Sequence, residues 1–170
     1  MFKLDLVRLE REGSLDVRAE IPADDPLWAE SDLRFRGPLR ARGRASLAGS
    51  GEVLVDLGVE GELEQECRRC LSPVRTPLEL RLLLVFGAVD EEGGGEDGEI
   101  RPLDPAAVEL DLGDAVREEL ILAVDPFVLC DPDCRGLCPR CGADRNRESC
   151  ECTLQEPDPR WDALRAMRKG

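Results

Sequence analysis

Hydrophobic and polar residues alternate along three stretches of the chain. Apolar residues fall on every second position of residues 14–21, on odd positions over residues 53–63, and on even positions over residues 78–86. A period of two is typical of a strand with one face in the core and the other in water. Glycine-containing turns such as residues 47–52, LAGSGE, separate these stretches closely enough for hairpins. We therefore expect an antiparallel sheet or partial barrel with one wet face.

Only a few helices are expected. Residues 108–112, VELDL, are typical of a further short strand, and Asp114 then suits the N-cap of a helix that runs to Ala123. Asp158 followed by Pro159 is typical of the start of a C-terminal helix. Residues 87–99, GAVDEEGGGEDGE, have dense negative charge and no apolar period, which indicates an acidic loop.

Charge is unevenly distributed along the chain. The 37 acidic and 23 basic residues give a net charge of -14. An acidic protein repels nucleic acid unless its positive charge is concentrated locally. Residues 33–51 provide such a concentration, because this stretch has no acidic residue and contains Arg34, Arg36, Arg40, Arg42 and Arg44.

Two interpretations of these arginines stay open. In an extended segment Arg40, Arg42 and Arg44 point to one side, with Arg34 and Arg36 on an extension before a Gly-Pro break. That side is either a solvated strand face near the sheet edge, where charge blocks unwanted pairing, or a nucleic-acid-binding surface whose guanidinium groups grip phosphates.

The N-terminal sequence indicates a cytoplasmic protein. The first 13 residues, MFKLDLVRLEREG, carry six charged side chains and leave no apolar stretch of the kind found in a signal peptide. No later segment approaches the length of a membrane span, so no membrane partner is expected. Thiols in the cytoplasm are kept reduced, and clustered cysteines there are more often metal ligands than disulfides.

Eight cysteines and no histidine define the candidate chemistry. Two pairs have the Cys-x-x-Cys spacing with which a tight turn offers two thiolates to one tetrahedral ion. Combining each with the next available pair gives two sets of four: Cys67, Cys70, Cys130 and Cys134, then Cys138, Cys141, Cys150 and Cys152. We expect two structural zinc ions, the first closing a loop of about sixty residues and the second ordering a local knuckle.

Other uses of the cysteines fit less well. A thioredoxin-like redox pair belongs at a strand-to-helix junction, whereas Cys67 and Cys70 lie between two predicted strands. Catalytic zinc commonly uses histidine and keeps an open position. Disulfides need an oxidising compartment, which the charged N-terminus does not indicate.

The predicted fold class is α+β, an antiparallel sheet or partial barrel with few helices and a C-terminal cysteine-rich zinc-knuckle module. The expected organisation has three parts. Residues 1–125 form a mainly β domain with one helix, residues 126–155 form the zinc module, and residues 156–170 form the C-terminal helix.

Four segments together match the pattern of a known family. They are CRRCL from Cys67, EELIL from Glu118 leading to Pro126, GLCPRCG from Gly136 with the later Cys150-x-Cys152, and DPRW from Asp158 with Leu164. With these segments the chain resembles the YceD family, bacterial and plastid proteins associated with accumulation of large-subunit ribosomal RNA. Many relatives have Asn-Leu-Asn after the knuckle, where this chain has Asp144-Arg145-Asn146.

The resemblance implies a non-enzymatic factor for the synthesis, processing or stability of large-subunit (23S) ribosomal RNA. Its implied partner is that RNA or a pre-ribosomal particle, with no small-molecule substrate. The residues themselves leave two other classes open. An acidic adaptor that binds a basic ribosomal protein suits the net charge, and a Cys-x-x-Cys thiol oxidoreductase fits least.

Overall fold

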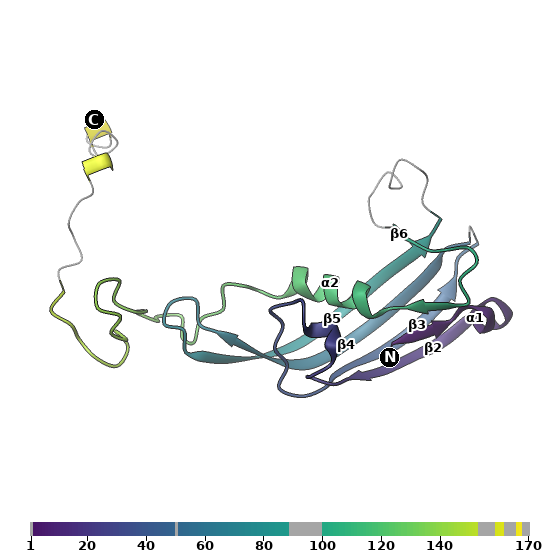
Figure 1. Cartoon of the computed structure of the whole chain (residues 1–170), viewed down its shortest axis with the longest axis horizontal. Coiled ribbons are helices and arrows are strands. Elements are labelled where there is room, and N and C mark those ends of the chain that lie inside the picture. The colour runs from purple at the N-terminus through teal and green to yellow at the C-terminus, as the bar shows by residue number, and fades with distance from the viewer. Residues whose placement is uncertain (1, 50, 89–99, 153–158, 162–165, 168–170) are drawn as a thin grey trace. The chain divides into compact units, whose positions relative to one another are not determined.

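The structure is a computed structural model that describes residues 2–49, 51–88, 100–152, 159–161 and 166–167. A five-stranded sheet with the order β2-β3-β4-β5-β6 accompanies a two-stranded sheet of β1 and β7 (Figure 1). The elements are β1 (Lys3–Asp5), α1 (Leu6–Glu12), β2 (Ser14–Ile21), η1 (Pro26–Trp28), β3 (Leu39–Leu47), β4 (Val53–Glu66), β5 (Pro73–Gly87), β6 (Ile100–Pro102), β7 (Glu109–Asp111), α2 (Gly113–Ala123) and η2 (Pro159–Trp161).

The chain divides into two units. The sheet unit comprises Met1–Gln65 and Val74–Pro126, and the cysteine unit comprises Glu66–Pro73 and Phe127–Gly170. The cysteine unit therefore combines the tip of the β4–β5 hairpin with a segment that follows much later in the chain. The fold class is α+β, as the sequence predicts, and the larger sheet is open rather than closed into a barrel.

The alternating stretches form the predicted strands. Residues 14–21 are β2, whose Leu15, Val17 and Ile21 are buried. In β4 most odd positions are buried, and in β5 most even positions from residue 78 onward are buried. β2, β3 and β4 pair antiparallel, as expected, but β6 joins β5 in parallel. One face of the sheet thus carries the core and the other faces solvent.

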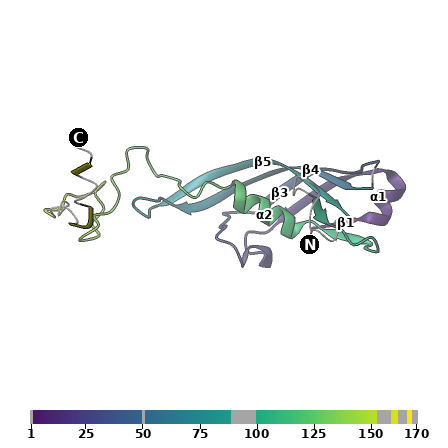
Figure 2. The same cartoon turned by 90° about the horizontal axis from the view of Figure 1, so that it is seen from above.

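Helix α2 lies along the core side of the sheet (Figure 2). Val116 and Leu120, four residues apart, are fully buried in the same apolar core as the strands, which is the helical spacing expected of a half-buried helix. The predicted strand at residues 108–112 is present as β7, which pairs with β1. β7 and α2 thus both contribute to the core, and they follow each other almost directly in the sequence.

The start of α2 differs from the sequence prediction. The N-cap residue is Leu112, which makes no side-chain hydrogen bond, and the predicted cap Asp114 lies in the first helical turn. The N–H of Gly113 instead donates to Oδ1 of Asp111 at 2.9 Å. Aspartate suits an N-cap, which is why the sequence favours Asp114, but the cap position is Leu112 and the carboxylate that accepts the hydrogen bond belongs to Asp111, the residue before it.

A short helix that the alternation does not predict, α1, connects β1 to β2. Its cap is Asp5, whose Oδ1 accepts a hydrogen bond from the N–H of Arg8 at 2.8 Å. Gly13 ends the helix with a φ of 74°, a conformation that favours glycine. Leu6 and Leu9 are buried on its inner side. The charged N-terminal stretch is thus an amphipathic turn packed on the core.

Two predicted segments lie largely outside the described residues. Of the acidic loop at residues 87–99, only residues 87 and 88 are described, and Gly87 belongs to β5. Of the C-terminal helix at residues 156–170, the structure describes the 3-10 turn η2 and the helical residues 166–167. Within the described ranges no helix combines the length and the apolar character that crossing a membrane requires.

Candidate functional site

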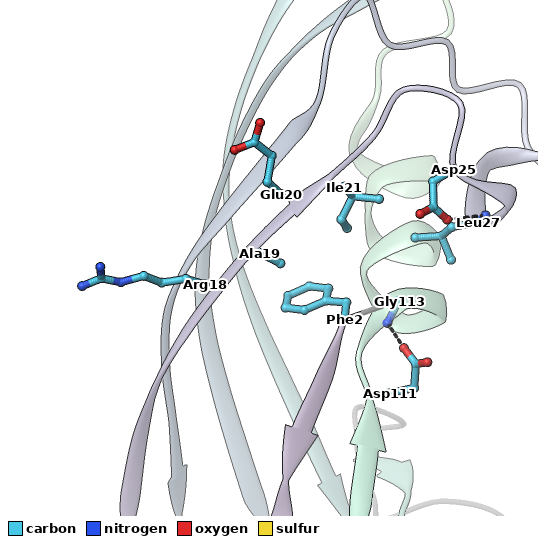
Figure 3. Close-up of a pocket in the computed structure, with 9 residues that line it drawn as sticks. All are labelled: Phe2, Arg18, Ala19, Glu20, Ile21, Asp25, Leu27, Asp111 and Gly113. Atoms are coloured by element: carbon cyan, nitrogen blue, oxygen red, sulfur yellow. Dashed lines mark hydrogen bonds between the residues drawn. The ribbon is translucent and has the colours of Figure 1, made fainter.

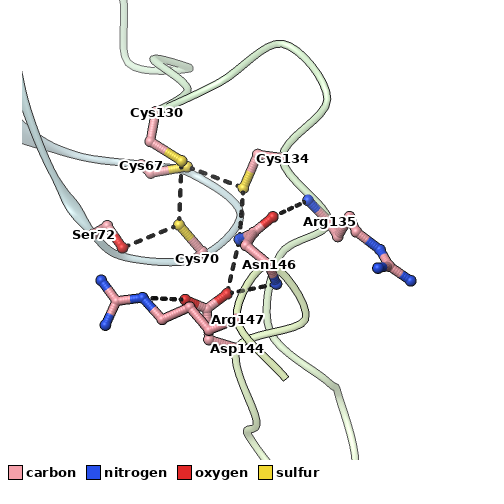
Figure 4. Close-up of polar contacts among 9 residues, drawn as sticks. All are labelled: Cys67, Cys70, Ser72, Cys130, Cys134, Arg135, Asp144, Asn146 and Arg147. Carbon is pink, nitrogen blue, oxygen red and sulfur yellow. Dashed lines mark hydrogen bonds and ion pairs between the residues drawn. The ribbon is translucent and has the colours of Figure 1, made fainter. Parts of the chain in front are cut away.

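Four cysteine sulfurs meet in the cysteine unit, and we call them the first cluster: Cys67, Cys70, Cys130 and Cys134. All four Sγ atoms lie within 4.8 Å of one another. Sγ of Cys67 is 3.7 Å from that of Cys134, and Sγ of Cys70 is 3.5 Å from that of Cys130 (Figure 4). Four thiolates at about 2.3 Å from a tetrahedral ion would be about 3.8 Å apart. The structure thus brings together the first set predicted from spacing, in a geometry that can hold a metal ion.

The tip of the β4–β5 hairpin presents the first two of these sulfurs. The N–H of Leu71 donates to the carbonyl of Cys67 at 2.9 Å, and the N–H of Cys67 donates to the carbonyl of Ser72 at 2.8 Å. Leu71 has a φ of 61°, in the left-handed region. A leucine in that region costs free energy, so the surrounding contacts must hold the turn in shape.

Backbone hydrogen bonds hold the later segment against this turn. The N–H of Arg68 donates to the carbonyl of Val128 at 2.9 Å, and the N–H of Leu137 donates to the carbonyl of Arg69 at 3.0 Å. Gly136 approaches so closely that a Cβ atom there would be 2.9 Å from the Arg69 carbonyl oxygen, and its φ is 70°. Only glycine suits this position, because both the space and the backbone conformation exclude a side chain.

The sulfurs of the first cluster differ in proton affinity. Burial raises the pKa of Cys67, but the backbone N–H groups of Cys130, Arg69 and Cys70 outweigh it and lower this pKa to about 6. Hydrogen bonds with the sulfurs of Cys70 and Cys134 raise the pKa of Cys130 to about 12. Four thiols this close cannot all ionise without a compensating cation. The donor set therefore suits a divalent metal, which would displace the remaining protons.

The second cluster is local and more exposed. Its sulfurs also lie within 4.8 Å of one another, and they belong to Cys138, Cys141, Cys150 and Cys152. The N–H of Gly142 donates to the carbonyl of Cys138 at 2.9 Å, and the φ of Gly142 is 76°. The N–H of Cys138 donates to the carbonyl of Ala143 at 2.8 Å. These bonds form the tight knuckle that the sequence predicts, with the glycine at its left-handed position.

The second cluster also contains a sulfur with a lowered pKa and another with a raised pKa. The backbone N–H groups of Cys141 and Arg140 lower the pKa of Cys138 to about 6. A hydrogen bond with the sulfur of Cys141, together with burial, raises the pKa of Cys152 to about 12. In each cluster a cation would displace the proton from a sulfur whose pKa is raised, Cys130 in the first and Cys152 in the second.

Asn146 links the two clusters, and sequence reasoning missed it. Its Nδ2 donates to Sγ of Cys134 at 3.4 Å and to Oδ1 of Asp144 at 2.8 Å, while its Oδ1 accepts from the N–H of Arg135 at 2.7 Å (Figure 4). Asp144 also pairs with Arg147 at 3.4 Å. Asn146 stands between the two cysteine pairs of the second cluster, so this loop orients a ligand of the first. The only signal in the sequence was the Asp-Arg-Asn tripeptide after the knuckle.

The arginines predicted to share a strand face do so. Arg40, Arg42 and Arg44 are all exposed on β3. β3 pairs with β2 on one side and β4 on the other, so it is not an edge strand and its charges do not protect an edge. Arg44 pairs with Asp16 at 3.2 Å and Arg40 with Glu20 at 3.9 Å. Charges that are segregated along the sequence are therefore mixed on the folded sheet.

Arg34 and Arg36 lie on a separate, shorter pairing. An isolated bridge joins Phe35 to Leu63, and both arginines are exposed beside it. Nη1 of Arg36 lies 3.2 Å from Oε2 of Glu64. The structure thus brings three of the five candidate arginines together on β3 and leaves the other two on the extension before the Gly-Pro break.

Comparison with known proteins gives matches to one named family. A model of the family described as large ribosomal RNA subunit accumulation protein YceD matches residues 55–168. An uncharacterized protein of Mycobacterium tuberculosis is 38% identical over 120 residues, which cover 68% of this chain and 55% of that protein. The chloroplastic large ribosomal RNA subunit accumulation protein YCED homolog 1 of Arabidopsis thaliana is 30% identical over 107 residues, covering 58% of this chain and 33% of that protein.

The protein of the same name in Zea mays is 29% identical over 141 residues, covering 66% of this chain and 45% of the maize protein. The chain therefore spans about half the length of the mycobacterial relative and a smaller share of the plant relatives. No solved structure matches the chain.

Proposed function

Because the chain belongs to the YceD family, we propose that it supports the accumulation of large-subunit (23S) ribosomal RNA as a non-enzymatic factor with two structural zinc ions. One observation carries the proposal: the family match at residues 55–168 includes both four-cysteine clusters. The part shared with the family thus contains all eight cysteines that would hold the proposed metal ions. A cytoplasmic location belongs to the same proposal.

Zinc suits the donor sets better than other biological metals. The chain has no histidine, and each cluster offers four sulfurs, which is a common ligand set of structural zinc. Four protein ligands fill a tetrahedral zinc site and leave no position for water or a substrate. The ions would therefore order the backbone of the cysteine unit and carry out no reaction, which supports a non-enzymatic role.

Elemental analysis of protein purified without added metal tests the zinc assignment. The expected content is two zinc ions per chain, because eight thiols divide into two complete sets. A content near one would leave only one cluster as a zinc site. A content near zero would refute the assignment.

The RNA role is tested by sedimentation of tagged protein with ribosomal precursors. The protein is expected in the large-subunit precursor fractions, and RNase should release it. A deletion strain should contain less large-subunit rRNA than its parent, and the intact gene should restore the level. Association that resists RNase would favour the second candidate, an adaptor that binds a basic ribosomal protein, for which the net charge of -14 speaks.

The third candidate, a thiol oxidoreductase, fits the geometry least. A redox pair needs an accessible thiolate, whereas Cys67 is fully buried and its sulfur lies in a group of four. Turnover of an insulin disulfide by the purified protein would overturn this judgement.

The arginines at residues 34–44 are part of the proposed RNA contact, but they lie outside the family match at residues 55–168. Only their charge and their position on the sheet therefore support a role in RNA binding. The strand register shows which of them have acidic partners.

A further inference from the structure

Three rows of residues with charged side chains cross β2, β3 and β4 on the side away from the core, and we call these rows the charged face. The residues of each row lie opposite one another on the antiparallel strands. The first row is Asp16, Arg44 and Asp56, the second is Arg18, Arg42 and Gly58, and the third is Glu20, Arg40 and Glu60. The outer rows alternate in sign, and the middle row has two arginines and no acid.

The outer rows are internally neutralised. Arg44 has a carboxylate on each side and pairs with Asp16 at 3.2 Å. The other carboxylate, Asp56, forms an ion pair with Arg81 of β5, whose Nη2 lies 2.6 Å from Oδ2 of Asp56. The hydrogen bond from Arg81 lowers the pKa of that carboxyl. Arg40 likewise lies between two glutamates. These arginines already have anionic partners in the folded protein.

The middle row is different. Within the part of the chain that the structure describes, neither Arg18 nor Arg42 forms an ion pair. The N–H of Leu47 donates to the carbonyl of Gly13, so these two residues form a hydrogen-bonded pair just before β2 begins. Hydrogen-bonded and non-hydrogen-bonded pairs alternate along antiparallel strands, which makes Arg18 and Arg42 a non-hydrogen-bonded pair. The Cα atoms of such a pair are about 4.5 Å apart. Like charges directly opposite on a sheet repel. Gly58 adds no side chain beside them, which leaves the row open.

The side chain of Arg18 faces solvent. Arg18 is one of the residues around the pocket of Figure 3, but its side chain points away from Phe2 and Gly113. Arg18 falls outside the arginine-rich stretch, so no local pattern connects it with Arg42. Only the strand register places them side by side.

We propose that Arg18 and Arg42 form a phosphate-binding clamp for structured large-subunit rRNA. This inference rests on the proposed function; of the five candidate arginines it keeps Arg42, and it adds Arg18 from the neighbouring strand. A phosphate held between two guanidinium groups removes their repulsion and accepts charge-assisted hydrogen bonds from both. Within the described ranges the only strongly exposed aromatic side chains are Phe127 and Trp161, both in the cysteine unit. The charged face thus provides no stacking platform, so it contacts the RNA backbone rather than the bases.

The acidic neighbours explain why the contact is confined to one row. Asp16 and Glu20 flank Arg18 on its own strand, about 7 Å away on each side. A polyanion lying along β2 would meet repulsion at both. A single phosphate that enters the middle row meets two unpaired cations instead.

The test compares two double variants that change the net charge equally. R18Q/R42Q removes the clamp, and R40Q/R44Q removes the paired arginines beside it on the same face. The probe is an in vitro transcript of large-subunit rRNA, with affinity measured over a range of salt concentrations. R18Q/R42Q should weaken binding about tenfold for each arginine lost, about 100-fold in total, and lower the salt slope by roughly 1 to 2. Its thermal unfolding should match or exceed that of the parent chain, since a repulsive pair is removed.

R40Q/R44Q should retain more than a tenth of the parent affinity. Equal losses in the two variants would overturn the clamp, because long-range charge would then suffice. Parent protein that binds, with R18Q/R42Q unaffected, would refute the clamp and leave the proposed function intact. Parent protein that does not bind the transcript at any salt concentration would contradict the RNA role itself. Tighter retention of polyglutamate than of the transcript through the same two arginines would assign the clamp to an acidic protein instead.

Discussion

The two units of this chain bury different kinds of side chain. In the sheet unit, a continuous apolar cluster runs from Phe2 to Leu120 through both sheets and α2. In the described part of the cysteine unit, the buried residues are Cys67, Cys70, Cys134, Gly136 and Cys138. A sheet with such a core can be stable by itself, whereas the proposed metal ions would stabilise the loop that carries the cysteines. On this proposal the two units have different sources of stability.

The largest expected difference between the two units is their response to metal removal. Structural zinc contributes about 10–16 kcal/mol in small zinc domains, more than any single side chain in the sheet. A chelator should therefore abolish amide protection in residues 127–152 and leave β2, β3 and β4 protected. Hydrogen exchange followed by peptide mass spectrometry measures both units in one sample. Equal loss of protection in both units would show that the sheet also depends on the metal.

Single cysteine changes should distinguish the clusters. Cys138→Ser should release one ion and unfold the knuckle, while Cys67→Ser should release the other ion and free the β4–β5 hairpin tip, because that cluster closes the longer loop. Elemental analysis and chemical unfolding measure the two effects. Loss of both ions from Cys67→Ser would contradict the independence of the second cluster.

A core truncation should affect only the sheet unit. Leu57 is fully buried in β4, so Leu57→Ala should lower the free energy of unfolding by about 2–5 kcal/mol. Leu83 of β5 is 67% exposed, and Leu83→Ala is the matched control with a change within about 0.5 kcal/mol. The zinc content of both variants should equal that of the parent. Zinc loss from Leu57→Ala would show that the units are not separate.

The smallest expected effect concerns the link between the clusters. Asn146→Ala removes the hydrogen bond to Sγ of Cys134 and should weaken metal binding at the first cluster by roughly 10- to 100-fold. Competition with a chromophoric chelator measures the affinity of each site. Glu148→Ala, an exposed change in the same loop, is the control and should have no effect. An equal effect of the two changes would assign the loss to loop disorder rather than to the hydrogen bond.

Local patterns were sufficient for β2, β4, β5 and β7 and for the cysteine sets, but not for β1, β3 and β6. Alternation with a period of two shows which side chains of a strand face the core. It predicted both ends of β2, and it predicted the ends of β4 and β5 to within a few residues of the observed ones. Ligand spacing similarly identified both sulfur clusters, because few groupings of eight cysteines keep each Cys-x-x-Cys turn intact.

Features that depend on partners distant in sequence were not predictable. The parallel pairing of β6 and the contact from Asn146 to Cys134 follow from the folded arrangement, not from neighbouring residues. The charge pattern gave an incomplete description for the same reason. Arg40 and Arg44 look like members of a basic stripe until β2 and β4 supply their carboxylates. Helix α1 was missed because seven residues give too few turns for a periodic signal.

The two clusters also differ in when they can form during synthesis. Cys70 meets Cys130, which is sixty residues later in the chain, so at about 5–20 residues per second the ribosome adds that partner roughly 3–12 s after Cys70. The second cluster lies within a much shorter segment and is complete almost as soon as its last cysteine is added. The thiols of the hairpin tip therefore wait without their partners while the rest of the sheet is made. During that interval they are open to oxidants and to competing metals, and the reducing capacity of the cell has to protect them.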